Sequence, residues 1–429
     1  MKIAVLVNQF PKVSETFILN QIAGLIDRGH TVDIFACYRS EDHIEDGQLR
    51  KYELLKRTRY LTAPASRKER VMAAMEATLK RGWKQPMHLM RSINLLPAGK
   101  RRISLEMLCQ HRFLLQRSAY DIIHCHFGPV GIFGQHLREI GALEGPLLTT
   151  FHGFDVGSYV RHHGAGAYAE LFRKGDAVTC SSHFMRGKLI AAGCDPAKIF
   201  PFKLGTDLAR FDFAERKIGS DGVIRLITIA RLVEKKGLEY SIRAVADLVR
   251  QFPNLQYTIV GDGNLRQKLS LLIEQLDLQR NVTLVGWKTP EEVRQLLDRS
   301  HIFVLASVVS SNGDFEGQGL VLQEAQAMGL PVVCTDHNGF CDSVLDGQSG
   351  FLVPERNVEA LSTRLAELIR RPEVWPRIGR KGRAFVEAEF DLNKRNDALV
   401  ELYSHLAAHR SEPTSFPPKK RTASMQSSP

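Results

Sequence analysis

The chain has 429 residues, of which 44% are hydrophobic and 24% are charged. This length predicts two domains of roughly 200 residues each, and the composition is that of a folded globular protein rather than a disordered one. No apolar run approaches the roughly 18 to 20 residues that span a bilayer as a helix, which argues against an integral membrane protein. The net charge of +11 is concentrated in residues 50–118, which hold 17 lysines and arginines against four glutamates. Such a region favours an anionic partner.

The N-terminal segment MKIAVLVNQF is interpreted as a first strand and not as a signal peptide, because no small-residue cleavage site follows it. The seven cysteines form no CxxC pair and lie mostly in apolar runs. This is typical of free thiols in a reducing compartment, so we expect a cytoplasmic protein.

Short β-rich apolar runs alternate with amphipathic helical patterns through both halves of the chain. The expected strands are Lys2–Val7, Thr31–Cys37, Asp121–Cys125, Leu147–Phe151, Ala177–Cys180, Ile224–Ile229, Gln256–Val260, Val282–Val285, Ile302–Leu305 and Pro331–Cys334. The expected helices are Glu15–Asp27, Val130–Ile140, Phe184–Ala192, Leu238–Arg250, Leu265–Leu276, Pro290–Asp298, Gly319–Met328 and Val358–Arg370. Buried strands separated by helices predict an α/β fold with parallel, doubly wound sheets.

A polar segment ending in a Gly/Ser/Asp cluster separates the two halves. The predicted division is an N-terminal Rossmann-like domain (1–203, with 50–118 as a basic insertion), a linker (204–222), a C-terminal Rossmann-like domain (223–372), helices that cross back (373–410) and a disordered tail (411–429). Ligands of open parallel sheets bind at the carboxyl ends of the strands, so we expect the site in a cleft between the domains.

The segment from Glu316 to Glu324 reads EGQGLVLQE. Its glycines predict the start of a helix that runs through Glu324 and ends near Gly329. Eight helical residues rise about 12 Å, so the two carboxylates are too far apart to share one water or proton as in a hydrolase. They suit the two ends of one long ligand, with the anion-binding N–H groups of a helix start between them. A nucleotide sugar has this layout of sugar, diphosphate and ribose.

This segment resembles the E-x7-E motif of retaining glycosyltransferases of family 4, which have the GT-B fold of two Rossmann-like domains facing across a cleft. The resemblance implies that Glu316 contacts the donor sugar and that Glu324 holds the ribose hydroxyls. It also implies that the backbone of Gly317, Gly319 and Leu320 faces the diphosphate of the donor. In such a fold the N-terminal domain is expected to bind the acceptor and the C-terminal domain the nucleotide sugar.

A second segment, ARLVEKKG, follows the expected strand Ile224–Ile229. It resembles the family's pair of cations five residues apart before a glycine, which assigns Arg231 and Lys236 to the diphosphate. There they would offset the charge that develops as the diphosphate leaves. Lys235 is interpreted as a solvated neighbour. The resemblance extends over nearly the whole chain and is strongest in residues 224–352.

Two further loops belong to the same half. Gly261 and Gly263 resemble the family's "GdG" loop, which is expected to shape the cleft and to approach the donor. Relatives commonly carry Gly-x-Pro-Glu where this chain has Gly339-Phe340-Cys341-Asp342. The sequence of this loop therefore departs from the family pattern, and its contacts are expected to differ as well.

In the N-terminal half, the sequence His152-Gly153-Phe154-Asp155 resembles the family's HG-x-D segment. The resemblance implies that His152 bonds the donor sugar and that Asp155 lies near it. His126 ends the expected strand Asp121–Cys125 and is a candidate for lining the cleft. His124 and His126 point the same way, but they have no third ligand at a sensible spacing, and the chain has no D-x-D triplet. We therefore expect no metal and no cofactor.

The first strand leads into FPKVSETF, the version of this loop seen in a branch that includes bacterial exopolysaccharide transferases of the colanic acid and amylovoran type. Ser14, Glu15 and Thr16 could bind an acceptor hydroxyl there. The structural alternative is that Ser14 caps the following helix.

The basic segment 50–118 alternates cations with apolar residues at roughly helical spacing. Such a surface suits an anionic membrane, which predicts a peripheral enzyme on the inner face of the plasma membrane. The acceptor expected there is a polyprenyl-diphosphate-linked or growing polysaccharide, and the expected donor is a UDP- or GDP-sugar. Two alternatives remain, a GT-B epimerase or phosphorylase and a non-enzymatic basic lipid- or nucleic-acid-binding protein. For the second alternative, the sequence contains no recognisable nucleic-acid-binding module, so no nucleic-acid partner is expected. The oligomeric state is left open.

Overall fold

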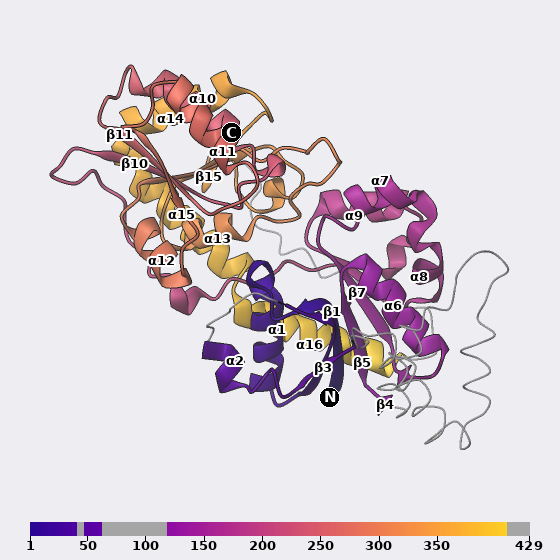
Figure 1. The fold of residues 1–429 in the computed structure, drawn as a ribbon. Helices are drawn as coiled ribbons and strands as arrows, with labels where there is room; N and C mark the ends of the chain where they lie inside the picture. The colour runs from indigo at the N-terminus through magenta and orange to yellow at the C-terminus, as the bar shows by residue number, and fades with distance from the viewer. Residues whose placement is uncertain (41–46, 62–117, 410–429) are drawn as a thin grey trace, which may run out of the picture.

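The computed structural model describes residues 1–40, 47–61 and 118–409. It shows two α/β domains, drawn in indigo to magenta and in magenta to yellow in Figure 1. The predictions for the tail 411–429 and for most of the basic segment 50–118 fall outside the described residues.

The N-terminal domain is built on a parallel sheet, which among the described residues has seven strands in the order β3-β2-β1-β5-β7-β8-β9. These strands are β1 Lys2–Phe10, β2 Thr31–Arg39, β3 Thr58–Tyr60, β5 Ile122–His126, β7 Leu147–Phe151, β8 Ala177–Cys180 and β9 Ile199–Pro201. The helices are α1 Thr16–Asp27, α2 Gly47–Lys51, α6 Gly128–Glu139, α7 Ser158–His163, α8 Ala169–Lys174 and α9 His183–Ala191, and two short strands, β4 Ser118–Ala119 and β6 Leu143–Glu144, pair with each other. Strands β5, β7 and β8 are buried along their whole length, as expected for central strands of a parallel sheet that is covered on both faces.

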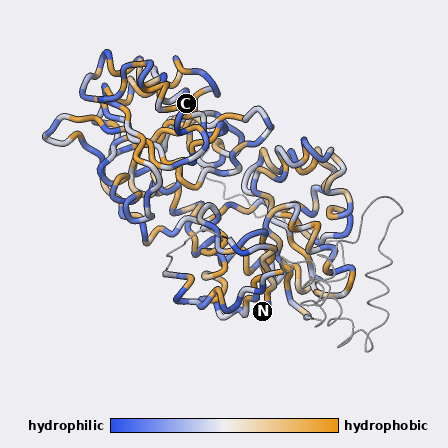
Figure 2. The backbone as a smooth tube through the Cα atoms, viewed as in Figure 1, coloured by the Kyte–Doolittle hydropathy of each residue, from blue (hydrophilic) through white to orange (hydrophobic). Residues whose placement is uncertain are grey.

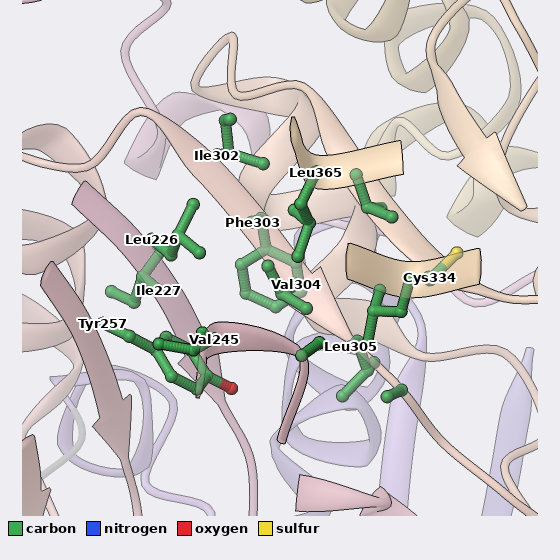
Figure 3. Close-up of a cluster of buried hydrophobic side chains, with 14 of the residues drawn as sticks. Leu226, Ile227, Val245, Tyr257, Ile302, Phe303, Val304, Leu305, Cys334 and Leu365 are labelled. Atoms are coloured by element: carbon green, nitrogen blue, oxygen red, sulfur yellow. The ribbon is translucent and has the colours of Figure 1, made fainter. Parts of the chain in front are cut away.

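The C-terminal domain has the same architecture, with six described parallel strands in the order β12-β11-β10-β13-β14-β15. These are β10 Ile224–Ile229, β11 Leu255–Val260, β12 Val282–Gly286, β13 Ile302–Leu305, β14 Val332–Thr335 and β15 Gly350–Val353. Its helices are α10 Leu238–Val249, α11 Arg266–Gln275, α12 Pro290–Asp298, α13 Leu320–Ala327, α14 Val358–Arg370 and α15 Trp375–Glu389. Figure 3 shows the core of this domain, where side chains of β10 and β13 such as Leu226 and Phe303 meet Val245 of α10 and Leu365 of α14.

The last described helix, α16 (Leu392–Ala408), leaves the C-terminal domain and packs against α1 of the N-terminal domain (Figure 1). Arg28 at the end of α1 pairs with Asp397 at 2.7 Å. Deeper in the domain, the hydroxyl of Tyr403 lies 2.6 Å from Nδ1 of His124 on β5. The C-terminal helix is thus part of the N-terminal core, and it joins the two domains a second time.

The predicted α/β fold with two doubly wound parallel sheets is confirmed, and the expected strands all form, with some differences in their ends. Strands β3, β9 and β15 were not predicted. Each lies at or next to an edge of its sheet and has three or four residues. β9 ends in Pro201 and β15 begins with Gly350, and both residue types are depleted in strands. Short edge strands therefore lack the buried apolar run that marks the central ones.

Hydrophobic and hydrophilic stretches alternate along the chain in both domains (Figure 2). In the described ranges 1–40, 47–61 and 118–409, no helix is both long enough and apolar enough to cross a bilayer.

Candidate functional site

The helix predicted between the two glutamates is confirmed as α13, and Gly319 stands immediately before its first residue with a φ of +74°. This left-handed conformation favours glycine, and α13 begins directly after it without a side-chain cap on its first N–H groups. Gly317 is needed for a different reason, since a Cβ added there would lie 2.5 Å from the carbonyl oxygen of His152 in the other domain. The glycines of this segment therefore shape a helix start and allow a close contact between the domains.

The carboxylate of Glu316 lies between two lysines. Nζ of Lys236 is 2.9 Å from Oε2, and Nζ of Lys235 is 3.3 Å from Oε1. Burial acts to raise the pKa of Glu316, but the charges of Lys236 and Lys235 outweigh it and lower the pKa to about 2. Glu316 is therefore ionised at neutral pH, although only 12% of its side chain is exposed.

The interpretation of Lys235 as a solvated residue is wrong. A short helical turn over Glu234–Lys236, ended by Gly237 at a φ of +58°, turns both lysines toward the loop before α13. The Lys235 side chain is only 12% exposed, and it also lies 3.0 Å from the carboxylate of Asp314. In a tight turn the side chains of two neighbouring residues can point to the same side, and the spacing of residues along the sequence does not reveal this.

Arg231 follows β10 at its carboxyl end, and its side chain is exposed. No ion pair involves Arg231 within the described part of the chain, so its charge is available to an incoming anion. The loop carrying Arg231 packs against the "GdG" loop after β11. A Cβ on Gly261 would lie 2.0 Å from the carbonyl oxygen of Ala230, and one on Gly263 would lie 2.5 Å from that of Leu232. The two glycines therefore allow the two loops to lie together at the same edge of the sheet.

Glu324 lies in the middle of α13 and has a different environment from Glu316. Burial raises its pKa to about 7, and the positive charge of Arg210 in the interdomain segment acts in the opposite direction. The two glutamates of the motif therefore differ, because the two lysines lower the pKa of Glu316 whereas burial raises that of Glu324.

His152 follows β7, and its ring stacks on that of His126 at the end of β5, with the centroids 5.4 Å apart. Nδ1 of His126 lies 3.1 Å from Nε2 of His152. Burial lowers the pKa of His152 to about 3 and that of His126 well below its usual value, so both rings are neutral. The expected position of His152 after a buried strand is confirmed by β7, and the structure brings its ring onto that of His126 at the end of β5.

Asp155 is fully buried and organises the backbone of this loop. Its carboxylate accepts hydrogen bonds from the N–H groups of His152 at 3.0 Å, Gly153 at 2.9 Å and Gly128 at 3.1 Å. Burial raises its pKa to about 6, and these hydrogen bonds oppose the shift. Its contacts are those of a residue that fixes the turn carrying His152.

The alternative in which Ser14 caps α1 is wrong. Ser14 lies inside a short 3-10 turn, Val13–Glu15, and α1 begins after Glu15 without a side-chain cap. Glu15 pairs with Lys12 at 3.0 Å. The adjoining Phe17 packs on His152 with their ring centroids 4.8 Å apart. The structure thus brings Phe17, which follows Thr16 in α1, against His152.

The two domains touch at the site itself. A Cβ on Gly153, whose φ is +125°, would lie 3.2 Å from the carbonyl oxygen of Phe315, the residue before Glu316. Nearby, the side chain of Gln318 exchanges two hydrogen bonds with the backbone of Leu204, at 2.8 and 2.9 Å. The segments that carry Glu316 and His152 are therefore direct neighbours.

The loop that departs from the family pattern also joins the domains. Oδ2 of Asp342 accepts from the backbone N–H of His183 at 2.8 Å, and Oδ1 lies 2.7 Å from Nδ1 of the same residue. A Cβ on Gly339 would lie 1.8 Å from the carbonyl oxygen of Gly317. Asp342 therefore holds the start of α9 in the N-terminal domain.

Two residues of the site were not singled out from the sequence. His337, which is fully buried, accepts the backbone N–H of Glu316 at its Nε2 at 3.1 Å, and its Nδ1 lies 2.5 Å from Oε1 of Glu355. Glu355 follows β15. It approaches the Glu316 loop only in the folded domain, so no local sequence pattern marks it. Among the described residues, no group of three or more His, Cys, Asp and Glu side chains gathers as a metal site would require.

Comparison with known families agrees with these features. Residues 14–210 match the family model described as Glycosyltransferase Family 4, and residues 211–385 match the model described as Glycosyl transferases group 1. The chain is 37% identical over 380 residues to the putative colanic acid biosynthesis glycosyltransferase WcaL of Salmonella typhimurium, covering 86% of this chain and 91% of that protein. It is 33% identical over 420 residues to the amylovoran biosynthesis glycosyltransferase AmsK of Erwinia amylovora, covering 95% of this chain and all of that protein.

Solved structures match over nearly the whole length. The crystal structure of HepE from Anabaena in complex with UDP and glucose superposes with a TM-score of 0.68 at 18% identity, covering 94% of this chain and 99% of that one. Sucrose-phosphate synthase from Thermosynechococcus elongatus gives a TM-score of 0.67 at 19% identity, covering 95% and 99%. The sequence relatives and the shared two-domain architecture together show that the chain belongs to the family 4 and group 1 glycosyltransferases of the GT-B fold.

Proposed function

We propose that this glycosyltransferase moves a sugar from a nucleotide-sugar donor to a lipid-linked or growing polysaccharide in bacterial exopolysaccharide biosynthesis, with retention of the anomeric configuration and without a metal. The observation that carries the proposal is the arrangement around Glu316. An ionised carboxylate, two lysines and the start of α13 lie together on the donor domain, and His152 lies beside them on the other domain.

Each part of a nucleotide sugar has a matching group in this arrangement. The sugar hydroxyls would meet Glu316 and His152, and the ribose hydroxyls would meet Glu324. The diphosphate would meet the backbone at Gly317, Gly319 and Leu320, where the first N–H groups of a helix favour an anion. A cation beside the leaving diphosphate stabilises the charge that develops on it as the bond to the sugar breaks.

Arg231 and Lys236 are the proposed cations. Arg231 is exposed at the end of β10, and Lys236 lies against Glu316. This division of charge supplies what a metal supplies in other transferases, and it is the reason for proposing a metal-independent reaction.

The names of relatives support the classes of donor and acceptor. HepE was solved with UDP and glucose, and a mannosyltransferase of Mycolicibacterium smegmatis, 28% identical over 298 residues, is named as dependent on GDP-mannose. An Escherichia coli relative, 26% identical over 342 residues, is named as acting on a diphosphoundecaprenol-linked sugar. We propose a UDP- or GDP-sugar as donor and a polyprenyl-diphosphate-linked glycan as acceptor. The basic segment 50–118 would bring the enzyme to the anionic membrane that holds such an acceptor.

The test begins with the donor. Thermal unfolding is measured with UDP-, GDP- and ADP-sugars, because a ligand that binds the native state stabilises it by mass action. A shift with one nucleotide class identifies the base. Transfer is then followed with that donor and a short polyprenyl-diphosphate glycan, and the anomeric configuration of the product is read by NMR.

Glu316→Ala should abolish transfer, and Glu367→Ala is the matched control, because Glu367 pairs with Arg364 on the exposed face of α14. Normal turnover by Glu316→Ala, or a product with inverted configuration, would contradict the proposal.

A further inference from the structure

Glu316 has one lysine at each carboxylate oxygen, and the two lysines are held differently. Nζ of Lys235 also lies 3.0 Å from Asp314 and donates to the carbonyl oxygen of Phe315 at 3.3 Å. The carbonyl oxygen of Lys235 accepts the N–H of Val308 at 2.9 Å. Lys235 is therefore tied to the loop that carries Glu316 at several points.

Lys236 has fewer ties. Its ion pair with Glu316, at 2.9 Å, is the one ion pair that Lys236 makes in the described ranges. Its backbone N–H donates to the carbonyl oxygen of Val233, which fixes the turn and leaves the side chain independent. The ammonium group of Lys236 can therefore turn away from Glu316 without breaking other ion pairs.

The proposed function requires such a movement. A lysine that binds the donor diphosphate has to give up at least part of its contact with Glu316, because the diphosphate carries the stronger negative charge. A buried carboxylate that loses its counter-ion is strongly destabilised in the ionised form, since water cannot replace the lost partner. Glu316 is 12% exposed and would face this cost if Lys236 were its one partner.

We propose that Lys235 is the permanent counter-ion of Glu316, which keeps this carboxylate paired while Lys236 exchanges it for the diphosphate of the donor. The inference rests on the proposed function, because it takes Glu316 as the sugar ligand and Lys236 as the diphosphate ligand. Lys235 acts through Glu316 and is a positioning residue. Its contacts with Asp314 and Phe315 keep the ammonium group in place during the exchange.

Among the titratable groups described around Glu316, only the two lysines can act as its counter-ions. The titratable groups near it come from five segments, and they are Lys235, Lys236, Asp314, His337 with Glu355 behind it, and His152 across the cleft. Burial lowers the pKa values of His337 and His152, so both rings are neutral at pH 7. The positive charges that Glu316 faces among the described residues are therefore those of Lys235 and Lys236.

The test uses nucleotide binding, because this measurement needs neither the sugar nor the acceptor. UDP and GDP are titrated calorimetrically into the wild type, Lys235→Met and Lys268→Met from about pH 6 to about pH 8. Two buffers with different ionisation enthalpies give the number of protons taken up on binding. Lys268 is the matched control, because its ion pair with Glu239 lies on the exposed surface of the same domain. The titration of the nucleotide itself cancels between variants.

In Lys235→Met, Glu316 and the diphosphate compete for Lys236. The dissociation constant should therefore rise about tenfold or more, and binding should take up a proton as Glu316 is neutralised. Wild type and Lys268→Met should show neither effect. Adding Glu316→Gln to Lys235→Met removes the competing carboxylate, so it should restore the affinity and abolish the extra proton uptake. Lys235→Arg keeps the charge and should bind as the wild type does.

Two outcomes would overturn the inference. One is that Lys235→Met matches Lys268→Met in both affinity and proton uptake, and the other is that Glu316→Gln fails to restore binding. If the wild type itself binds neither UDP nor GDP, the proposed function fails instead. Thermal unfolding establishes that each variant is folded, and if Lys235→Met is not, Lys235→Gln replaces it with the same expectation.

Discussion

The backbone N–H of Glu316 donates to Nε2 of His337 at 3.1 Å, and this contact ties the acidic motif to the loop after β14. Because Nε2 accepts this N–H, the proton of the neutral His337 ring lies on Nδ1, which faces Oε1 of Glu355. Oε2 of Glu355 accepts the N–H of Val309 at 3.1 Å. Glu355 therefore holds the loop before α13 at two places, through Val309 and through His337.

We expect His337→Phe to lower kcat/KM for transfer by about tenfold or more, because the N–H of Glu316 loses its acceptor and its carboxylate loses its fixed position. His337→Gln offers a side-chain oxygen in place of Nε2 and should recover part of the activity. Steady-state kinetics with the donor identified by thermal shift, together with unfolding curves, makes the measurement.

The control is His301→Phe. His301 is also buried in the C-terminal domain, where its Nδ1 accepts the N–H of Arg225 at 3.0 Å and its ring stacks on Trp375. It lies outside the site, so this variant should lose stability to a similar extent and retain kcat/KM. Equal kinetic losses in the two variants would show that His337 acts through stability alone.

Gly317 gives a second prediction, because it lies where the domains meet. In Gly317→Ala the new Cβ would lie 2.5 Å from the carbonyl oxygen of His152, so the domains could not approach as closely as they do here. Transfer should fall by about tenfold or more, since the sugar would no longer contact both domains at once.

Gly187→Ala is the matched control for this change. Gly187 lies in α9, and a Cβ there would meet nothing within 4 Å. This variant should keep full transfer and become slightly more stable, because alanine favours a helix. If Gly317→Ala transfers as well as Gly187→Ala does, the contact between the domains is not required for the reaction.

The helix of the acidic motif could be predicted from sequence because it depends only on residues within the motif. The glycines between Glu316 and Glu324 determine where α13 begins, whatever surrounds them. The spacing of Arg231 and Lys236 is equally local, since both belong to one loop after β10. The two sheets followed from continuous apolar runs, which are the signature of strands buried on both faces.

The partners of the motif could not be predicted, because they come from distant segments. His337 and Glu355 meet Glu316 only once β14 and β15 lie in the sheet. Lys235 was misread because the direction of a side chain in a tight turn depends on the backbone, which residue type does not reveal. Ser14 was misread as a cap because the residues before α1 form a 3-10 turn that starts one residue earlier.

Buried histidines predict a loss of stability in acid. His124 has a usual pKa of 6.5, and burial lowers it to about 3 in the folded protein. Between these values the unfolded chain binds a proton that the folded chain does not, so the free energy of unfolding falls as the pH falls, by up to about 1.4 kcal/mol per pH unit. Below the lower value both states are protonated and the loss is complete.

Urea unfolding from about pH 7 down to about pH 5 measures this slope. His126 and His152 contribute in the same direction, because burial lowers their pKa values as well. His124→Gln removes one titrating group, and it should therefore unfold with a visibly shallower dependence on pH than the wild type. Parallel curves for the two proteins would mean that His124 does not stay neutral in the folded state.

The last prediction concerns the hydroxyl of Tyr403, through which α16 reaches the N-terminal core. This side chain is fully buried, and its oxygen lies 2.6 Å from Nδ1 of His124. On the other side of that ring, Nε2 lies 2.7 Å from the hydroxyl of Thr150 on β7. Tyr403→Phe keeps the ring but leaves Nδ1 of His124 buried without its partner, which should cost about 1 to 3 kcal/mol in the free energy of unfolding.

Ser404→Ala is its control, because the hydroxyl of Ser404 lies on the exposed side of the same helix and donates to Val400 of α16 itself. It should change the free energy of unfolding by no more than about 0.5 kcal/mol. If Tyr403→Phe is as stable as Ser404→Ala, the hydrogen bond to His124 contributes little, and the apolar contacts of α16 with α1 and β5 hold the helix in place. If the loss is seen, then the C-terminal helix, added last in the sequence, is coupled to the strand that carries His126 and so to the position of His152 in the site.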